Sequence, residues 1–395
     1  MIPTPTTPKH PALTPTIVGI AELPPRRTTP GVTTLELIAQ VAVAATIDAG
    51  LDHRAIDGLV CGPHVGETPQ HVPATVAEYL GLQSTFADIV DLGGATAAGM
   101  VWRAGAAIAA GMCTTVLCVL AHSRDPQTPA RSPNRNPIRE FDVPYGASGA
   151  NQAYAMVAQR HMAEFGTTTE QLMTVAVKER QNAQTNPDAV FYGRPITLDD
   201  VRRSPIVMRP LHQYEIVMPC GGAAALLVTS ADRARDLRSS PVTLLGAGEF
   251  VTHRALSQAP SLTTSPLSVA IDRAYRQAGI GPSDLDLLCP YDCYSILLPI
   301  TVEDAGLCAK GDGGPWVAEH DFSHRSRLPI NPHGGQLGCG QADLAGGAGH
   351  IIEAVRQLRG TAAGRQIDGT ELALVTGNGA TFSEEVALVL AGDLR

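Results

Sequence analysis

The stretch Asp91-Leu-Gly-Gly-Ala-Thr-Ala-Ala-Gly-Met-Val-Trp-Arg-Ala-Gly-Ala-Ala-Ile-Ala-Ala-Gly111 decides how the chain is organised. It opens with a Gly-Gly pair, continues with small side chains, and ends at a glycine before the strand-like run Thr114–Leu120. Helices built from Gly and Ala suit places where neighbouring elements approach closely. We therefore expect a buried central helix whose N-terminus, with its free N–H groups and the positive end of its dipole, points at a functional site.

Short apolar runs and amphipathic stretches alternate on both sides of this helix. Residues 16–21, 56–61 and 87–91 have the pattern of strands, and Thr34–Gly50 has the apolar spacing of a helix that ends at a glycine. Two further runs, 372–376 and 386–390, supply the last strands. This alternation predicts an α/β fold of layered, mixed and mainly parallel sheets.

The second part of the chain repeats the pattern of the first. Leu244–Phe250 resembles Ile17–Leu23, and residues 278–288 resemble residues 49–59. A Gly-rich turn followed by a helix at 331–360 stands where the central helix stands in the first half. Two copies of one strand–helix–strand unit explain these repeats best.

Residues 122–219 differ in composition from the rest of the chain and contain many Pro, Arg and Asn residues. Within them, residues 186–219 are expected to be irregular. We interpret residues 122–219 as an insertion between two neighbouring core strands, and loops of this length are usually functional. The predicted organisation is a flexible tail at 1–13, an N-terminal half at 14–121 plus 220–240, a loop-domain insertion at 122–219 and a C-terminal half at 241–395.

Composition excludes several classes of function. The formal charge is -9 and basic residues are scattered, which argues against a nucleic-acid partner. Residues 1–11 are rich in Pro and Thr and lack an apolar run, so we expect no signal peptide. The most apolar window, 92–121, is broken by Arg103 and several glycines, so we expect no membrane span. Most of the eight cysteines lie in apolar runs, and Cys289-x3-Cys293 has no second pair at zinc spacing. Free thiols, a cytoplasmic location and no metal site are expected.

Four turns are candidates for the functional site. None of them is a phosphate-binding loop, a dinucleotide fingerprint or a nucleophile elbow. They are Gly93–Thr96, Pro290–Ser295, Asn331–Gln341 and Thr376–Thr381.

These turns, the insertion and the duplicated halves resemble the thiolase superfamily over residues 14–395. The chain is most similar to its sterol-carrier-type, lipid-transfer thiolase-like branch. The strings that carry the resemblance are Gly166–Glu170, Asn186–Ala189, Glu303–Leu307, Asn331-x-His-Gly-Gly335 and Gly377–Gly379. The resemblance implies a thiolase fold, with two duplicated α/β halves and an inserted loop domain.

The signature groups of thiolases are absent. Gly94 stands at the position of the nucleophilic Cys, and Thr96 stands at the hydroxyl residue of the same motif. Gln341 replaces the His of the Gly-His-Pro string, and residues 375–383 contain no Cys for acid–base work. Because glycine cannot form an acyl-enzyme, Claisen chemistry through a covalent intermediate is not expected.

Tyr291-Asp292-Cys-Tyr294 resembles the corresponding motif of Cys-less acyl-CoA aldolases that shorten steroid side chains, in which the Tyr is assigned to acid–base work. Retro-aldol cleavage of a β-hydroxyacyl thioester needs a base for the hydroxyl proton and donors for the enolate, but no acyl-enzyme. With a reference pKa of about 10, Tyr291 needs a lowered pKa or serves mainly as a proton donor. The alternative interpretation is a packed aromatic at a strand end.

Cys339 stands where those aldolases carry a second Tyr, after Gly334-Gly-Gln-Leu-Gly338. Either Cys339 takes over an acid–base role, with a pKa lowered at a helix N-terminus, or the position has lost its function. His333 is a candidate acid–base group or donor to the thioester carbonyl, and alternatively it orients the turn. The expected substrate-binding residues are Gly94, Thr96, Asp292, Gln341, Gly377 and Gly379.

The resemblance implies a CoA thioester as substrate and no covalently bound cofactor. It also implies a homodimeric core and a small partner protein with an OB-fold and a zinc ribbon, so zinc is expected only in the partner. Two other functions stay open. One is a degenerate thiolase that binds acyl-CoA or acts as a scaffold, and the other is a carbon–carbon bond-forming acyltransferase that uses a remaining cysteine.

Overall fold

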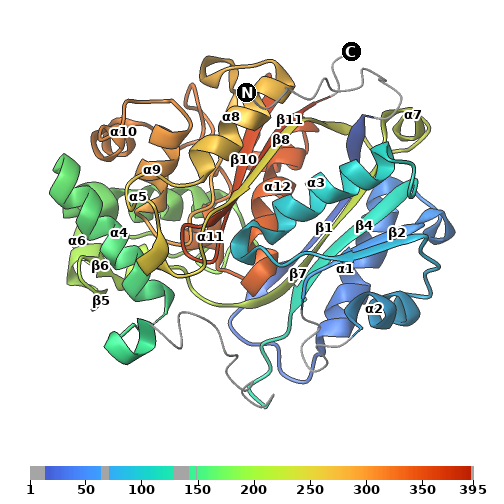
Figure 1. Cartoon of the computed structure of the whole chain (residues 1–395), viewed down its shortest axis with the longest axis horizontal. Coiled ribbons are helices and arrows are strands. Elements are labelled where there is room, and N and C mark those ends of the chain that lie inside the picture. The colour runs from blue at the N-terminus through green and yellow to red at the C-terminus, as the bar shows by residue number, and fades with distance from the viewer. Residues whose placement is uncertain (1–13, 64–70, 128–141, 148, 393–395) are drawn as a thin grey trace.

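The computed structural model describes residues 14–63, 71–127, 142–147 and 149–392 (Figure 1). Its strands are β1 (Pro15–Arg26), β2 (Gly58–Cys61), β3 (Phe86–Ile89), β4 (Thr115–His122), β5 (Ile206–Met208), β6 (Leu211–His212), β7 (Gly221–Ser230), β8 (Val242–Val251), β9 (Leu287–Cys289), β10 (Leu372–Gly379) and β11 (Glu384–Ala391). Its helices are α1 (Thr34–Ala49), α2 (Val72–Leu80), α3 (Thr96–Ala109), α4 (Ala150–Phe165), α5 (Thr169–Asn182), α6 (Leu198–Arg203), α7 (Ala231–Ala234), α8 (Leu267–Ala278), α9 (Leu297–Asp304), α10 (Gly313–Glu319), α11 (Gly335–Cys339) and α12 (Gly346–Leu358). The tail expected at 1–13 lies outside the described residues. Within those residues, no helix combines the length and the apolar character that crossing a membrane requires.

Local sequence signals fix the ends of the longer helices. At the start of α1, the Thr33 hydroxyl accepts from the Glu36 N–H at 3.2 Å, and the Glu36 carboxylate accepts from the Thr33 N–H at 2.7 Å. Gly50 ends α1 with a left-handed φ of 68°, a conformation that costs glycine little. Thr168 and Gln171 form the same reciprocal cap before α5. Both helices therefore lie where their sequences predict them.

Nine of the described strands form one sheet in the order β3-β2-β4-β7-β1-β8-β11-β10-β9. In the first half β1, β2, β3 and β4 run one way and β7 runs the other way. In the second half β8, β9 and β10 share a direction and β11 is reversed. The two halves have matching strand orders: β1, β7, β4 and β2 correspond to β8, β11, β10 and β9. In the first half β3 follows, paired with β2, and in the second half an isolated bridge between Ile330 and Leu288 of β9 takes its place. The mixed and duplicated arrangement is thus visible in the topology, with most strands of each half running in one direction.

The stretch quoted at the outset forms α3, which lies at the centre of the molecule beside α12 (Figure 1). The central hydrophobic cluster joins both helices to strands of both halves, with Met100 and Ile351 among its buried members. Helices α1 and α2 pack on the outer face of the first half, and α8 packs on that of the second half. The prediction of a buried central helix is confirmed.

The insertion leaves and re-enters the sheet between adjacent strands, because β4 and β7 pair from Thr115 opposite Thr229 to His122 opposite Gly222. It carries α4, α5 and α6, and α5 packs against α10 and α11 of the second half. The expectation that 186–219 is irregular is wrong for α6 and for the two-stranded sheet of β5 and β6. A reciprocal cap between Thr197 and Asp200 starts α6.

Candidate active site

The N-terminus of α3 is shaped by glycines on two segments. A Cβ on Gly377 or on Gly379 of β10 would collide with the backbone before α3, so these glycines let β10 lie directly against the turn Gly93–Ala95. Thr96 is fully buried, and its hydroxyl accepts from the Leu92 N–H at 3.0 Å. These three residues therefore hold the turn in shape.

Tyr291 follows β9 and brings its side chain to this turn. Its backbone N–H donates to the Thr376 hydroxyl at 3.1 Å, and its phenol oxygen accepts from Gln341 Nε2 at 2.6 Å. The side chain is 3% exposed. A Cβ built on Gly94 would overlap the Tyr291 hydroxyl. The phenol oxygen therefore occupies the volume that any side chain at position 94 would need.

Gln341 is held by the last segment of the insertion. Its N–H donates to the Met218 carbonyl at 2.9 Å, and its carbonyl accepts from the Cys220 N–H at 2.7 Å. Just before them, the Val217 N–H donates to the Cys293 carbonyl at 3.1 Å. This segment therefore ties the two functional turns of the second half to each other.

A cavity of about 1660 Å³ opens beside the Tyr291 hydroxyl. Its lining near this hydroxyl includes Gly94, Cys293, Tyr294, Gln341 and Asn378. Tyr154 of α4 also lines it, donating to Asn378 Oδ1 at 2.6 Å and stacking on Tyr294 with ring centroids 4.2 Å apart. Small-molecule pockets usually measure about 300–1,000 Å³, so this cavity has room for an unusually large ligand.

The phenols of Tyr291 and Tyr154 stay protonated at neutral pH. Burial raises the pKa of Tyr291 well above its ordinary value, and the neighbouring Cys293 raises it further. Burial likewise raises the pKa of Tyr154. Among the described residues, the charged side chains that line the cavity are Arg27, Arg180, Arg194, Arg254, Asp142 and Asp200. The excess of cations favours an anionic ligand.

Comparison with known proteins shows to which family the chain belongs. The family described as Thiolase C-terminal domain-like matches residues 248–392. A steroid side-chain-cleaving aldolase of Thermomonospora curvata is 34% identical over 376 residues, which cover 91% of this chain and 93% of that protein. The chain belongs to the thiolase superfamily. A 17-hydroxy-3-oxo-4-pregnene-20-carboxyl-CoA lyase of Mycobacterium tuberculosis is 33% identical over 356 residues, covering 87% of this chain and 90% of that protein.

The thiolase fold is confirmed by a solved structure described as an Ltp2-ChsH2(DUF35) aldolase. It matches with a TM-score of 0.87 and 32% sequence identity, and the match covers 97% of this chain and 99% of that one. The sequence resemblance to the aldolase-containing branch of the superfamily is confirmed as well.

Among the residues selected from thiolase motifs, the structure brings Tyr291, Gly94 and Gln341 together at the large cavity. Thr96, Gly377 and Gly379 shape the turn behind it and do not line it. Asp292 is fully buried, and its carboxylate accepts the N–H groups of Gln336 at 2.8 Å and of Leu337 at 3.1 Å. The structure therefore places Asp292 as an anchor for α11.

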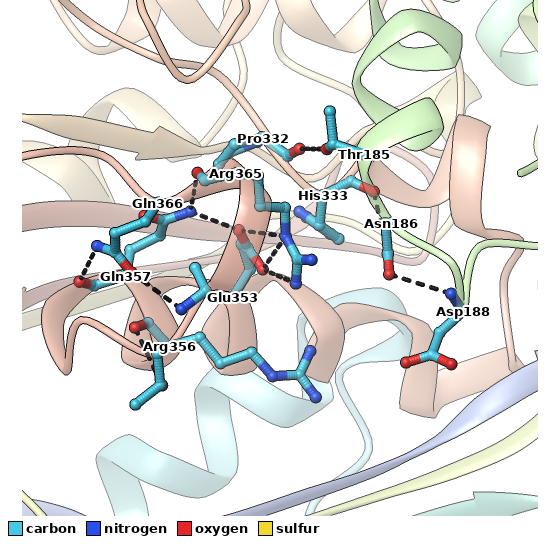
Figure 2. A network of polar contacts seen from close by, with 12 residues as sticks. Thr185, Asn186, Asp188, Pro332, His333, Glu353, Arg356, Gln357, Arg365 and Gln366 are labelled. Atoms are coloured by element: carbon cyan, nitrogen blue, oxygen red, sulfur yellow. Dashed lines mark hydrogen bonds and ion pairs between the residues drawn. The ribbon is translucent and has the colours of Figure 1, made fainter.

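Cys339 and His333 border a different, interior cavity of about 20 Å³. Cys339 Sγ donates to the His333 carbonyl at 3.2 Å. Asn186 Nδ2 donates to the same carbonyl at 3.2 Å (Figure 2). Although Cys339 keeps some accessible surface, burial raises the pKa of its thiol, and Glu22 raises it further. The expectation of a lowered thiol pKa is wrong, because Cys339 is the last residue of α11 and so lies away from the helix N-terminus, and because desolvation and nearby acidic groups raise the pKa.

His333 is a neutral side chain in this environment. Burial lowers its pKa well below the ordinary value, and His350, Arg365 and Arg356 lower it further. Arg365 in turn pairs with Glu353 at 2.8 Å within the network shown in Figure 2. The structure does not place His333 in the cavity with Tyr291.

The sequence interpretation missed Asn378 and Tyr154. Asn378 lies between the two selected glycines, Gly377 and Gly379, and alternation along β10 points it to the opposite side from them. That alternation was the signal available for Asn378. Tyr154 lies in a helix of the insertion without any motif, so only the fold brings it to the site.

Proposed function

We propose that the chain is a carbon–carbon lyase that cleaves a β-hydroxyacyl-CoA thioester by a retro-aldol reaction, without an acyl-enzyme. One observation carries this proposal: the Tyr291 hydroxyl fills the volume of the missing thiolase nucleophile and lines the large cavity. The relatives described as a steroid side-chain-cleaving aldolase and a carboxyl-CoA lyase support the same reaction class. We assign the substrate a bulky, steroid-like acyl group, which the size of the cavity accommodates.

In this proposal Tyr291 moves the proton. As the bond between the α and β carbons breaks, the β-hydroxyl of the substrate gives its proton to the Tyr291 oxygen. The Tyr291 proton passes to the α carbon of the enolate, so that a carbonyl compound and a shortened acyl-CoA are released. The phenol is neutral before and after the step, which agrees with its raised pKa.

Gln341 orients the phenol and stabilises the enolate. One hydrogen of its amide nitrogen is donated to the Tyr291 oxygen at 2.6 Å. An amide nitrogen carries two hydrogens, and the second is available for the thioester oxygen. A donor fixed in place before the reaction stabilises charge that develops on that oxygen. Cys339 and His333 have no assigned step.

The active form is proposed to be a complex. Exposed apolar side chains line the cavity, with Tyr145 91% exposed and Val143, Met156 and Val207 beside it in the lining. A small OB-fold protein with a zinc ribbon would cover them, and the zinc would belong to that partner. The name of the related Ltp2-ChsH2(DUF35) aldolase pairs two proteins, which supports this arrangement. We also propose a homodimeric core and a cytoplasmic location, which suits eight free cysteines.

The test replaces Tyr291 in the purified complex. Tyr291→Phe removes the hydroxyl and keeps the ring, so kcat should fall by about 10²–10⁴-fold with little change in KM. Tyr275→Phe is the matched control, because Tyr275 is also buried but donates to the Ala305 carbonyl at 3.4 Å, away from the cavity. Release of carbonyl product from β-hydroxyacyl-CoA is the readout.

Wild-type activity in Tyr291→Phe would contradict the proposal. Saturable binding of CoA esters without turnover in any complex would favour the binding or scaffold function. Covalent labelling of a cysteine by acyl-CoA would favour the acyltransferase.

A further inference from the structure

Two buried carboxyl groups meet behind Tyr291, and they differ in their hydrogen bonds. Asp292 accepts from Gln336 N–H through Oδ1 and from Leu337 N–H through Oδ2. Glu179 of α5 accepts from Asn331 Nδ2 at 3.0 Å through Oε1, whereas its Oε2 has no partner among the described residues. Both side chains are completely buried. An unpartnered oxygen in such a place is costly unless it carries a proton to donate.

Gly335 shows where the two groups face each other. A Cβ built on Gly335 would collide with Asp292 Oδ2 and would lie 2.8 Å from Glu179 Oε2. The two oxygens therefore point at one spot that only a glycine leaves free. Two ionised carboxylates do not persist this close in a dry site, so one of them holds a proton. Burial, and then the charge of Asp292, raises the pKa of Glu179 well above its ordinary value.

We propose that Glu179 is a positioning residue: it stays protonated and donates a hydrogen bond through Oε2 to Asp292, which locks the turn carrying Gln341 against Tyr291. Asp292 directly follows Tyr291 and binds the first N–H groups of α11. Gln341 lies just beyond α11 and donates to the Tyr291 hydroxyl. Glu179 thus connects the insertion to the proton-carrying phenol through three hydrogen-bonding steps: Glu179 to Asp292, Asp292 to α11, and Gln341 to Tyr291.

The other charged groups around α5 have their own partners. On the same helix, Lys178 donates to three carbonyls at the end of α10, and Arg180 stacks on Phe191 with 3.7 Å to the ring centroid. From α12, His350 Nε2 lies 3.2 Å from Asp292 Oδ1. The remaining groups are Cys289 of β9, Glu215 with His212 on the segment before β7, and Arg202 of α6 with Glu170. Among these described groups none is a cation paired with Glu179.

The experiment compares Glu179→Gln with the wild-type chain by urea unfolding across pH. A group whose pKa is higher in the folded than in the unfolded chain loses its stabilising effect as pH rises above the unfolded value, here 4.5. Between about pH 5 and pH 8, the unfolding free energy of the wild-type chain should therefore fall relative to that of Glu179→Gln. The difference between the two pH slopes should correspond to about one proton that the folded wild-type chain binds and the unfolded chain does not. Glu170→Gln is the control, because Glu170 lies on the same helix with its side chain 68% exposed.

Activity in the complex provides the second readout and rests on the proposed function, whereas the unfolding readout does not. The amide of Glu179→Gln can donate to Asp292 as the protonated acid does, so this variant should keep kcat within about threefold. Glu179→Ala should lose about ten- to a hundredfold in kcat, because the turn shifts under Tyr291. Equal pH slopes in Glu179→Gln and the wild-type chain would overturn the proposal, as would failure of Glu179→Gln to fold. Inactivity of the wild-type complex itself would count against the lyase function alone.

Discussion

At the residue scale, the Tyr291 hydroxyl fills the volume that a side chain at position 94 would need, and this excludes a nucleophile there. The resemblance to thiolases implies a nucleophilic Cys at the position of Gly94, and this chain has no room for such a side chain there. A thiol there would need the phenol to leave, and the phenol is fixed by Gln341 at 2.6 Å. A side chain at position 94 and the phenol in its present place therefore exclude each other.

Gly94→Cys should not restore thiolase activity. The added side chain collides with Tyr291, and overpacking of a buried site costs about 1–3 kcal/mol. We expect a lower free energy of unfolding in urea and loss of lyase activity, with no acylation detected by intact mass after incubation with acyl-CoA. An acyl group on the introduced thiol would contradict this prediction.

Cys339→Ala should keep most of the activity. The thiol borders the interior cavity with His333 and not the large cavity, and burial raises its pKa, so no thiolate is available. Iodoacetamide should leave Cys339 unlabelled at about pH 8, as followed by peptide mass spectrometry. Rapid labelling together with loss of turnover would show that Cys339 belongs to the site.

Motif positions selected a turn that reaches the cavity, but they did not show which of its side chains line the cavity. Cys339 and Gln341 are two residues apart, yet α11 ends between them and Gly340 takes a left-handed φ of 90°. The chain turns there, so only Gln341 faces Tyr291. The sequence shows the glycine, whereas the direction of the turn depends on the hydrogen bonds that Met218 and Cys220 make with Gln341.

At the scale of elements, a buried ion network joins the insertion to the second half. His161 of α4 lies 3.1 Å from Glu303 Oε1 of α9, and both side chains are fully buried. Lys310 Nζ reaches Glu303 Oε2 at 2.9 Å, and the Gly313 N–H donates to Oε1 at 2.8 Å. Burial alone would raise the pKa of Glu303, but His161 and Lys310 outweigh it and the pKa is lowered.

Glu303→Gln should reduce stability and flatten its dependence on acid. A carboxyl group whose pKa is lowered by folding contributes stability above its unfolded value of 4.5, and this contribution is lost as pH falls through the folded value. Wild-type unfolding free energy should therefore drop below about pH 4.5 more steeply than that of Glu303→Gln. Urea unfolding between about pH 3 and pH 7 measures this dependence. Parallel curves of unfolding free energy against pH for the two proteins would contradict the lowered pKa of Glu303.

Elements with strong local signals could be predicted, and those that depend on distant contacts could not. The capping residues Thr33 and Thr168 indicate in the sequence where α1 and α5 begin. The sheet of β5 and β6 has only short strands, Ile206–Met208 and Leu211–His212, whose residues show no alternation to detect. The pairing of β5 with β6 depends on how the rest of the insertion folds around them.

At the scale of the whole molecule, three parts of the chain meet at one phenol. The first half supplies Gly94, the second half supplies Tyr291 and Gln341, and the insertion supplies Tyr154 and the segment that holds Gln341. The duplicated fold could be predicted from repeated patterns. The cavity could not, because it is bounded by side chains far apart in sequence.

Tyr145→Asp should weaken the proposed complex without unfolding the chain. Tyr145 is 91% exposed and lines the cavity, where a covering partner would bury it. A central aromatic in an interface often contributes 2 kcal/mol or more, so Kd should rise by about thirtyfold. Isothermal titration with the partner measures this change, and Arg160→Ala on the exposed part of α4 is a control. Unchanged affinity would place the partner elsewhere.

Product analysis without free CoA tests the central claim most directly. Thiolytic cleavage consumes free CoA and passes through an acyl-enzyme, whereas the retro-aldol step proposed for Tyr291 needs neither. The complex, given only a β-hydroxyacyl-CoA, should release a carbonyl compound and a shortened acyl-CoA in equal amounts by mass spectrometry. A requirement for free CoA, or an acyl adduct on the protein, would contradict the account.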